Sequence, residues 1–202
     1  MQLTSDHNMD VVLAEDFLQE VETAYAERSR HYHTLAHLQT LLTFSEEYKN
    51  QLKCKPIIDF AIYYHDIVYK ASGSSNEDQS ARIAEERLSK LKFPEEERKV
   101  VVDFILATKS HTINSSPYEN ELKWFLDFDL SVLGADEPVY FEYVKNIRKE
   151  FRIYPDLLYK PGRRKVLQHF LNMGFIFKTQ EFRNRFEKQA RVNLQKEFDK
   201  LK

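Results

Sequence analysis

The chain has 202 residues, which is enough for one domain with a well-buried core, and nothing in it requires a second domain. Its formal net charge of −2 leaves no basic excess, which excludes extended binding to nucleic acid or to an anionic membrane surface. Cys54 is the single cysteine, so no internal disulfide forms, and neither a signal peptide nor an apolar run of roughly 18 residues is present. We therefore predict a cytoplasmic protein.

The predicted elements are all helical. An aromatic fraction of 13%, with only four Gly and six Pro, leaves little material for a turn-rich β fold. Apolar residues recur at helical spacing in segments that cover residues 8–28, a stretch ending near Leu52, 57–69, 77–91, 94 to about 108, 119–133, 137–152, 161–173 and 179–201. We predict an all-α, single-domain bundle of about eight to ten helices, in which helices of about 137–202 pack on a core of about 10–134.

Several helix ends carry a capping signal. Asn8 or Asp10 can cap the first helix, and Asn76 precedes a later helix as its expected N-cap. Gly134 follows another helix, at the position where a left-handed C-cap is expected.

The most apolar stretch, residues 57–69, contains an adjacent pair of ionisable residues, His65 and Asp66. Apolar residues on nearly every side predict a helix that is buried all round. Buried charge is costly unless it is paired or coordinates a metal, so the two residues are either a hydrogen-bonded pair or metal ligands. Asp59 lies on the same stretch, and we expect its replacement by Asn to be nearly silent.

Two further ionisable residues fall on apolar faces of predicted helices. His37 lies among leucines on the side of its helix that faces the core. Asp129 has Phe125 and Leu133 one turn away and therefore points inward, whereas Asp127 lies on a more polar side of the same helix. Asp129 is thus the carboxylate predicted to be out of place.

His37, His65, Asp66 and Asp129 together offer two imidazoles and two carboxylates. This mixture of nitrogen and oxygen donors suits one divalent ion, which can be Mn²⁺, Fe²⁺, Co²⁺, Ni²⁺, Zn²⁺ or Mg²⁺. An octahedral shell around such an ion leaves positions for water, as in catalytic rather than structural metal sites.

The order His, then His-Asp, then Asp resembles the HD superfamily of metal-dependent phosphohydrolases. The chain is similar to one bacterial branch of predicted members over about residues 10–200, through Arg30-x-Tyr32-His33-x-x-x-His37, Tyr64-His65-Asp66-x-Val68-Tyr69, Asn76-Glu77-x-x-Ser80-Ala81, Thr108-Lys109-x-His111 and Asp127-x-Asp129-Leu130-x-x-Leu133-Gly134. The resemblance implies an HD-type helical bundle, with His37, His65, Asp66 and Asp129 as metal ligands. It also implies hydrolysis of a phosphomonoester or phosphoanhydride of a small, nucleotide-like molecule.

Five more residues have both a catalytic and a plain interpretation. Glu77 and the metal ligand Asp66 are the predicted catalytic residues. Glu77 either orients or deprotonates the attacking water, or it is simply a first-turn Glu favoured by the helix dipole. His33 either contacts substrate phosphate or a second metal, or bonds a neighbouring carboxylate. Lys109 and His111 either bind phosphate or are simply cations favoured at a helix C-terminus. Arg30 is a bidentate phosphate clamp or part of an exposed salt bridge.

Two other functions remain open. One is a non-catalytic, metal-dependent nucleotide-binding module. The other is a di-iron oxygenase, which would need additional His ligands between His65 and Asp129, where only His111 lies. The predicted partner is a small phosphorylated substrate, without a membrane or extended nucleic acid, and the prediction allows for a homodimer.

Overall fold

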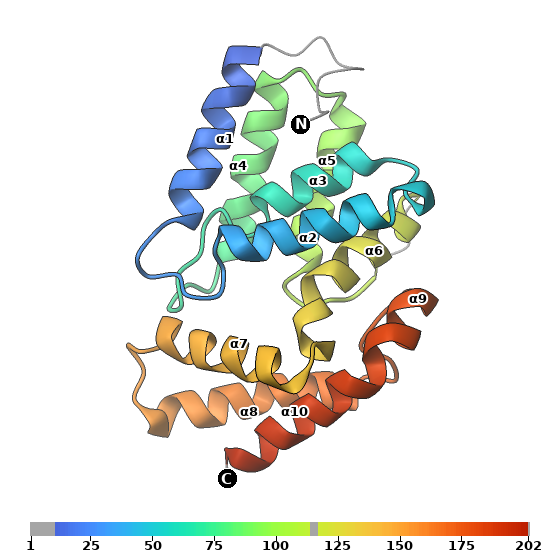
Figure 1. Cartoon of the computed structure of the whole chain (residues 1–202). Helices are drawn as coiled ribbons and strands as arrows, with labels where there is room; N and C mark the ends of the chain where they lie inside the picture. The colour runs from blue at the N-terminus through green and yellow to red at the C-terminus, as the bar shows by residue number, and fades with distance from the viewer. Residues whose placement is uncertain (1–10, 114–116, 202) are drawn as a thin grey trace. The chain divides into compact units, whose positions relative to one another are not determined.

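The computed structural model describes residues 11–113 and 117–201, and every regular element in that part of the chain is helical (Figure 1). The all-α prediction is confirmed. The α-helices are α1 Val11–Tyr25, α2 Leu35–Glu47, α3 Lys55–Tyr64, α4 Asn76–Lys90, α5 Glu95–Ala107, α6 Glu119–Leu130, α7 Glu137–Glu150, α8 Asp156–Asn172, α9 Gln180–Phe182 and α10 Lys188–Lys200. Within the described ranges, no helix has the length and apolar character needed to cross a membrane.

Contacts group the chain into two compact units, Met1–Phe125 and Leu126–Lys202. The first unit holds α1 to α5 and the beginning of α6, and the second holds α7 to α10. Helix α6 continues without a break across the boundary. The expectation of a single domain, with C-terminal helices packed on the metal-binding core, stays a prediction.

The first unit is built around α3, whose apolar residues pack against α2, α4 and α5. Ile57, Ile58 and Ile62 are completely buried, which fits a helix with apolar residues on nearly every side. Helix α4 is tied to α1 by Arg87, whose guanidinium donates two hydrogen bonds to the Glu20 carboxylate at 2.9 and 2.8 Å. The His-Asp pair follows directly after the buried helix α3.

Helix α3 ends earlier than the sequence predicts, at Tyr64, so the His-Asp pair follows the helix instead of lying inside it. In a continued helix the N–H of Asp66 would donate to the carbonyl of Ile62. That carbonyl accepts from Nδ1 of His65 at 2.8 Å instead, and the Asp66 N–H donates to the hydroxyl of Tyr25 at 3.2 Å. Both backbone groups therefore bond to side chains instead of to each other, and the helix ends here.

Two capping predictions have different outcomes. Asn8 and Asp10 lie outside the described residues. Asn76 is wrong as an N-cap: it is the first residue of α4, and its side-chain amide bonds both the N–H and the carbonyl of Lys70 at 3.2 and 2.9 Å. Because the amide is used in this way, it closes the loop before α4 and does not cap the helix.

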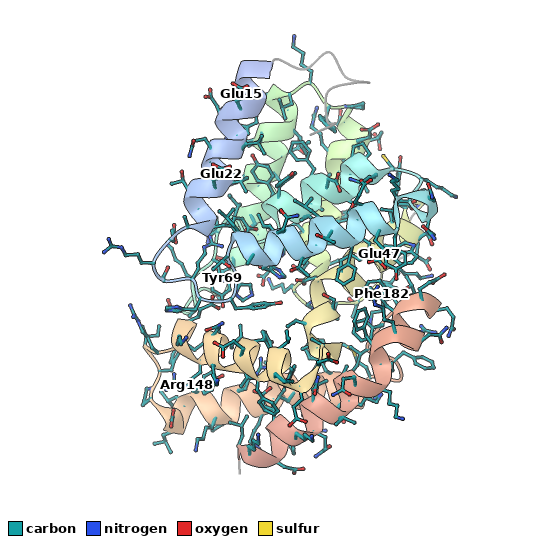
Figure 2. All side chains as sticks on the ribbon, viewed as in Figure 1. Glu15, Glu22, Glu47, Tyr69, Arg148 and Phe182 are labelled. Carbon is teal, nitrogen blue, oxygen red and sulfur yellow. The ribbon has the colours of Figure 1, made fainter. Side chains whose placement is uncertain are left out.

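The second unit has an aromatic core and a buried ion pair. The Arg163 guanidinium of α8 donates to both carboxylate oxygens of Glu197 of α10, at 2.8 and 3.0 Å, and the Tyr140 hydroxyl of α7 donates to the same carboxylate at 2.5 Å. These contacts join α7, α8 and α10. Phe182, labelled in Figure 2, belongs to a cluster of rings formed by Phe128, Phe177, Phe182 and Phe186.

Gly134 is not a left-handed cap, because no glycine among the described residues has a positive φ. It ends the short 3₁₀ helix Ser131–Gly134, which lies against the π-helical turn Arg183–Glu187. A Cβ atom at position 134 would lie 2.5 Å from Cβ of Phe186 and 2.7 Å from its carbonyl oxygen. Close backbone approach therefore explains this glycine.

We expect Gly134→Ala to lower the free energy of unfolding by about 1–3 kcal/mol, because the added methyl group forces the two turns apart. Gly162→Ala is the matched control: a Cβ there meets nothing within 4 Å, and Ala favours the helix interior by about 0.5–1 kcal/mol. Urea denaturation of both variants should give shifts of opposite sign. A stabilised Gly134→Ala protein would contradict the close-approach explanation.

Candidate metal centre

His65 follows the last residue of α3 and is almost fully buried, at 1% exposure. Its Nδ1 lies 2.8 Å from the carbonyl oxygen of Ile62. A carbonyl oxygen can only accept, so Nδ1 carries a proton, and whenever the ring is neutral Nε2 presents a lone pair. This arrangement is typical of metal-ligating histidines, whose second nitrogen donates to a backbone carbonyl or a carboxylate.

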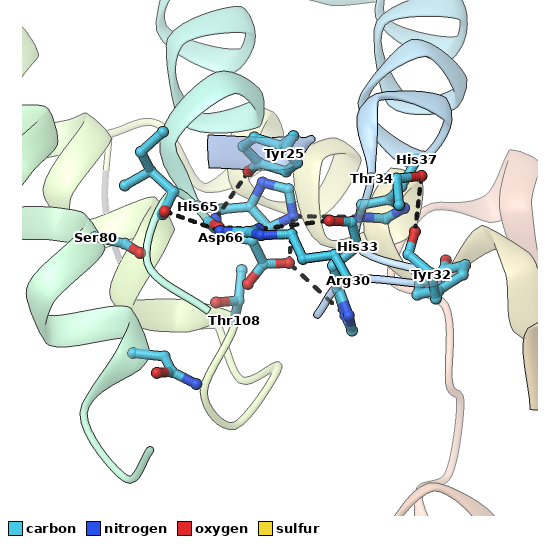
Figure 3. A network of polar contacts seen from close by, with 12 residues as sticks. Tyr25, Arg30, Tyr32, His33, Thr34, His37, His65, Asp66, Ser80 and Thr108 are labelled. Carbon is cyan, nitrogen blue, oxygen red and sulfur yellow. Dashed lines mark hydrogen bonds and ion pairs between the residues drawn. The ribbon is translucent and has the colours of Figure 1, made fainter. Parts of the chain in front are cut away.

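Two other ligand-type atoms converge on that lone pair (Figure 3). Nε2 of His37, a buried residue of α2, lies 3.3 Å from Nε2 of His65. The Oδ2 atom of Asp66 lies 3.2 Å from the same nitrogen. A lone pair that faces a carboxylate oxygen is repelled unless a proton or a cation lies between them, so this position binds either a proton or a metal ion.

Asp129 is placed by the helix that carries it. The ring of Phe125 meets the His65 ring edge-on, at 5.9 Å between centroids. Asp129 lies four residues further along the unbroken α6, on the same face of the helix. His37, His65 and Asp129 each offer a ligand atom, and these atoms all lie within 4.8 Å of one another.

This cluster could hold a metal ion. Two imidazoles and a carboxylate, with the carboxylate of Asp66 beside them, match the mixed N and O donor set expected for a divalent transition metal or Mg²⁺. The residues thus fit the predicted ion, whose identity they leave undefined. Asp66 is not one of the three residues whose ligand atoms all lie within 4.8 Å of one another, and its Oδ2 lies between Nε2 of His65, at 3.2 Å, and Nε2 of His33, at 3.8 Å.

His33 lies beside Asp66 and against an aromatic ring. Its imidazole packs on Tyr69 with 4.1 Å between ring centroids, and its side chain is 17% exposed, as is that of Asp66. The sequence left two roles open for this residue, phosphate or second-metal contact and pairing with a carboxylate. The 3.8 Å separation from Asp66 is longer than a hydrogen bond, so both roles stay predictions.

Arg30 is buried, whereas both sequence-based interpretations require an accessible guanidinium. The residue is 5% exposed, and its Nη1 and Nη2 donate to the backbone carbonyls of Asp66 and Ile67 at 2.7 and 3.0 Å. The exposed salt bridge is therefore wrong, because the donors are used inside the protein. A clamp on substrate phosphate would have to compete with these carbonyls.

The other predicted substrate residues lie at the ends of α4 and α5. Glu77 is half-buried in the first turn of α4, and among the described residues it has no hydrogen bond or ion pair to the ligand candidates. Lys109, just after α5, pairs with Asp78 at 3.1 Å on the surface. His111 has a φ of 51°, a left-handed conformation that a non-glycine residue adopts at a cost of about 1–2 kcal/mol. The roles of Glu77, Lys109 and His111 stay predictions.

Asp127 is a buried carboxylate that the sequence interpretation missed. It is 0% exposed and accepts three hydrogen bonds, from the N–H of Lys178 at 2.6 Å and from the N–H and hydroxyl of Thr179, both at 2.7 Å. Burial raises the pKa of Asp127 to about 6, although the hydrogen bonds act in the opposite direction. Asp127 is more buried than the half-buried Asp129, so the prediction that Asp127 lies on a more polar side of the helix is wrong. Asp127 holds the segment before α9.

Comparison with protein-family models, with curated protein sequences and with solved structures gives no match for this chain. The function must therefore be inferred from the side chains of the cluster.

Proposed function

We propose that this protein is a metal-dependent phosphohydrolase of the HD type, which acts on a small, nucleotide-like phosphorylated molecule. The observation that carries the proposal is the convergence of His37 Nε2 and Asp66 Oδ2 on Nε2 of His65, at 3.3 and 3.2 Å. The ordered sequence motif supports the reaction class.

In this proposal His37, His65, Asp66 and Asp129 hold one divalent cation. When bound, such an ion supplies a Lewis acid that lowers the pKa of a water molecule and polarises a phosphoryl oxygen. The chain's own contribution is to fix the ligands: the Ile62 carbonyl orients the His65 ring, and the Tyr25 hydroxyl holds the backbone of Asp66.

The remaining roles belong to residues at the ends of α4 and α5. Glu77 is the proposed base that takes a proton from the attacking water. His33, Lys109 and His111 are proposed to neutralise the phosphoryl oxygens, a stabilisation that is larger in a partly desolvated site than in bulk water. The surface pair of Lys109 with Asp78 would have to open for that contact.

The test is metal analysis of protein purified without chelator, joined to a screen of p-nitrophenyl phosphate and nucleoside mono-, di- and triphosphates. We expect bound divalent metal and phosphate release that EDTA abolishes and one added metal restores. Metal with tight nucleotide binding but no turnover would instead indicate a non-catalytic module. Two iron atoms per chain would indicate an oxygenase, and no bound metal would overturn the proposal.

The stabilisation by metal should depend on pH. Protons compete with the ion for the imidazole nitrogens, whose ordinary pKa in peptides is near 6.5, so bound metal stabilises above that pH and less as the pH falls. At a free-ion concentration of about 100 Kd the expected stabilisation is about 2.7 kcal/mol at pH 7.5. Melting temperatures with added metal and with EDTA, from pH 7.5 to 5, should converge. His169→Gln, an exposed change on α8, should leave that profile unaltered.

A further inference from the structure

Arg30 contacts the backbone of the metal centre instead of its ligand atoms. Its Nη1 donates to the carbonyl of Asp66 at 2.7 Å and its Nη2 to the carbonyl of Ile67 at 3.0 Å, while the carbonyl of His33 lies 3.5 Å from Nη1 (Figure 3). One guanidinium therefore connects the two loops that carry His33 and Asp66. Successive carbonyls match the planar, forked arrangement of guanidinium donors, which an ammonium group lacks.

Aromatic side chains hold the guanidinium and Asp66 from other sides. The rings of Tyr25 and Tyr69 lie 4.7 and 5.7 Å from Cζ of Arg30, within the range of cation–π attraction. The Tyr25 hydroxyl also accepts the Asp66 N–H at 3.2 Å, so the peptide groups on both sides of this residue are fixed. The same Tyr69 ring packs against His33 at 4.1 Å.

The positive charge of Arg30 is not neutralised by a close carboxylate. The nearest described carboxylate is that of Glu27, 3.9 Å from Nε and on a side chain that is 55% exposed. The buried Nε has no hydrogen-bond partner among the described residues. Burying a charged group with an unsatisfied donor is costly, so this arginine stabilises the fold less than its number of contacts suggests.

We propose that Arg30 is the positioning residue of the metal centre: its forked donors set the Asp66–Ile67 backbone so that the Asp66 carboxylate meets Nε2 of His65. This inference rests on the proposed metal-dependent function. In this proposal Arg30 does not contact substrate phosphate, which was one of the two sequence-based interpretations, but acts on the metal centre by positioning Asp66.

The sign of one effect separates positioning from electrostatics. Arg30 carries a positive charge close to a proposed cation site, and like charges repel. If only charge mattered, Arg30→Met would strengthen metal binding. If Arg30 positions Asp66, the same change weakens binding, because the carboxylate is no longer held toward His65.

The experiment measures Co²⁺ affinity by competition with a chelator, together with the visible absorption spectrum of the Co²⁺ protein and the melting temperature in EDTA. We expect Arg30→Met to lower affinity about 10- to 100-fold, the range found when residues that orient metal ligands are removed, and to alter the spectrum. Arg30→Lys keeps the positive charge but lacks the forked pair of donors. Compared with Arg30→Met, it should restore the melting temperature more fully than the Co²⁺ affinity.

Arg87→Met is the matched control. Arg87 is also partly buried in the first unit, over the ring of Phe17 at 5.6 Å and bonded to Glu20, away from His65 and Asp66. It should lower the melting temperature in EDTA while leaving Co²⁺ affinity and spectrum unchanged.

Each outcome decides between the hypotheses. Wild-type affinity or tighter binding in both Arg30 variants, or an equal loss in Arg87→Met, would overturn the positioning role while leaving the metal centre intact. Absence of Co²⁺ binding by the wild-type protein would overturn the proposed function and this inference with it. If Arg30→Met does not fold, a loss of affinity in folded Arg30→Lys supports the role, and wild-type affinity there refutes it.

Discussion

Asp66→Asn is expected to reduce divalent-metal affinity and phosphate release by about 100-fold or more while the protein remains folded. The change removes one anionic ligand beside Nε2 of His65 but keeps the size of the side chain. The Asp66 backbone contacts to Tyr25 and Arg30 do not depend on the carboxylate and should persist. Chelator competition, metal analysis and the phosphate-release assay give the measurement.

Asp103→Asn is the appropriate control, because Asp103 lies on the exposed side of α5. Asp59→Asn, which was expected from the sequence to have almost no effect, is unsuitable as a control. It is 9% exposed and accepts hydrogen bonds from Ser45 at 2.5 Å and Lys55 at 2.6 Å, so its replacement disturbs the contact between α2 and α3. Full metal content and full hydrolysis in Asp66→Asn would remove Asp66 from the ligand set.

Asp127→Ala is expected to lower the free energy of unfolding by about 3–5 kcal/mol, the largest stability effect that we predict. It leaves the N–H groups of Lys178 and Thr179 and the Thr179 hydroxyl without their buried acceptor. Asp129→Asn should instead abolish metal binding with little change in stability, since Asp129 is half-buried. Urea denaturation in EDTA, beside metal analysis, distinguishes the two. Similar effects of both changes would contradict the separate roles.

The pH dependence of stability gives a second measure of Asp127. Burial raises its pKa to about 6, above the ordinary value near 4, so between these values the native state holds a proton that the unfolded state has lost. The resulting stabilisation is complete below about pH 4 and is lost as the pH rises through about 6. The deficit of Asp127→Ala relative to wild type should therefore widen by about 2 kcal/mol as the pH falls from 7 to 4. A constant deficit would show that this carboxyl does not titrate abnormally.

The sequence by itself determined the helical fold and the types of side chain in the candidate site. The helical spacing of apolar residues is a local property of the sequence. It therefore predicted α5 and α7 without information about the helices that pack against them. It also identified His37 and His65 as ionisable residues on apolar segments, and both are buried. Burial of a residue's own helix face can be inferred from neighbours three or four positions away.

Only the tertiary structure decided where α3 stops, why residue 134 is glycine and what Arg30 and Asp127 do. Arg30 bonds carbonyls 36 and 37 residues away, and Asp127 accepts from residues 51 and 52 positions later. Spacing along a helix gives the direction of a side chain but not the group that meets it. A buried polar residue must find a hydrogen-bond partner, and in a helical protein that partner comes from another element, whose position depends on the packing of the core.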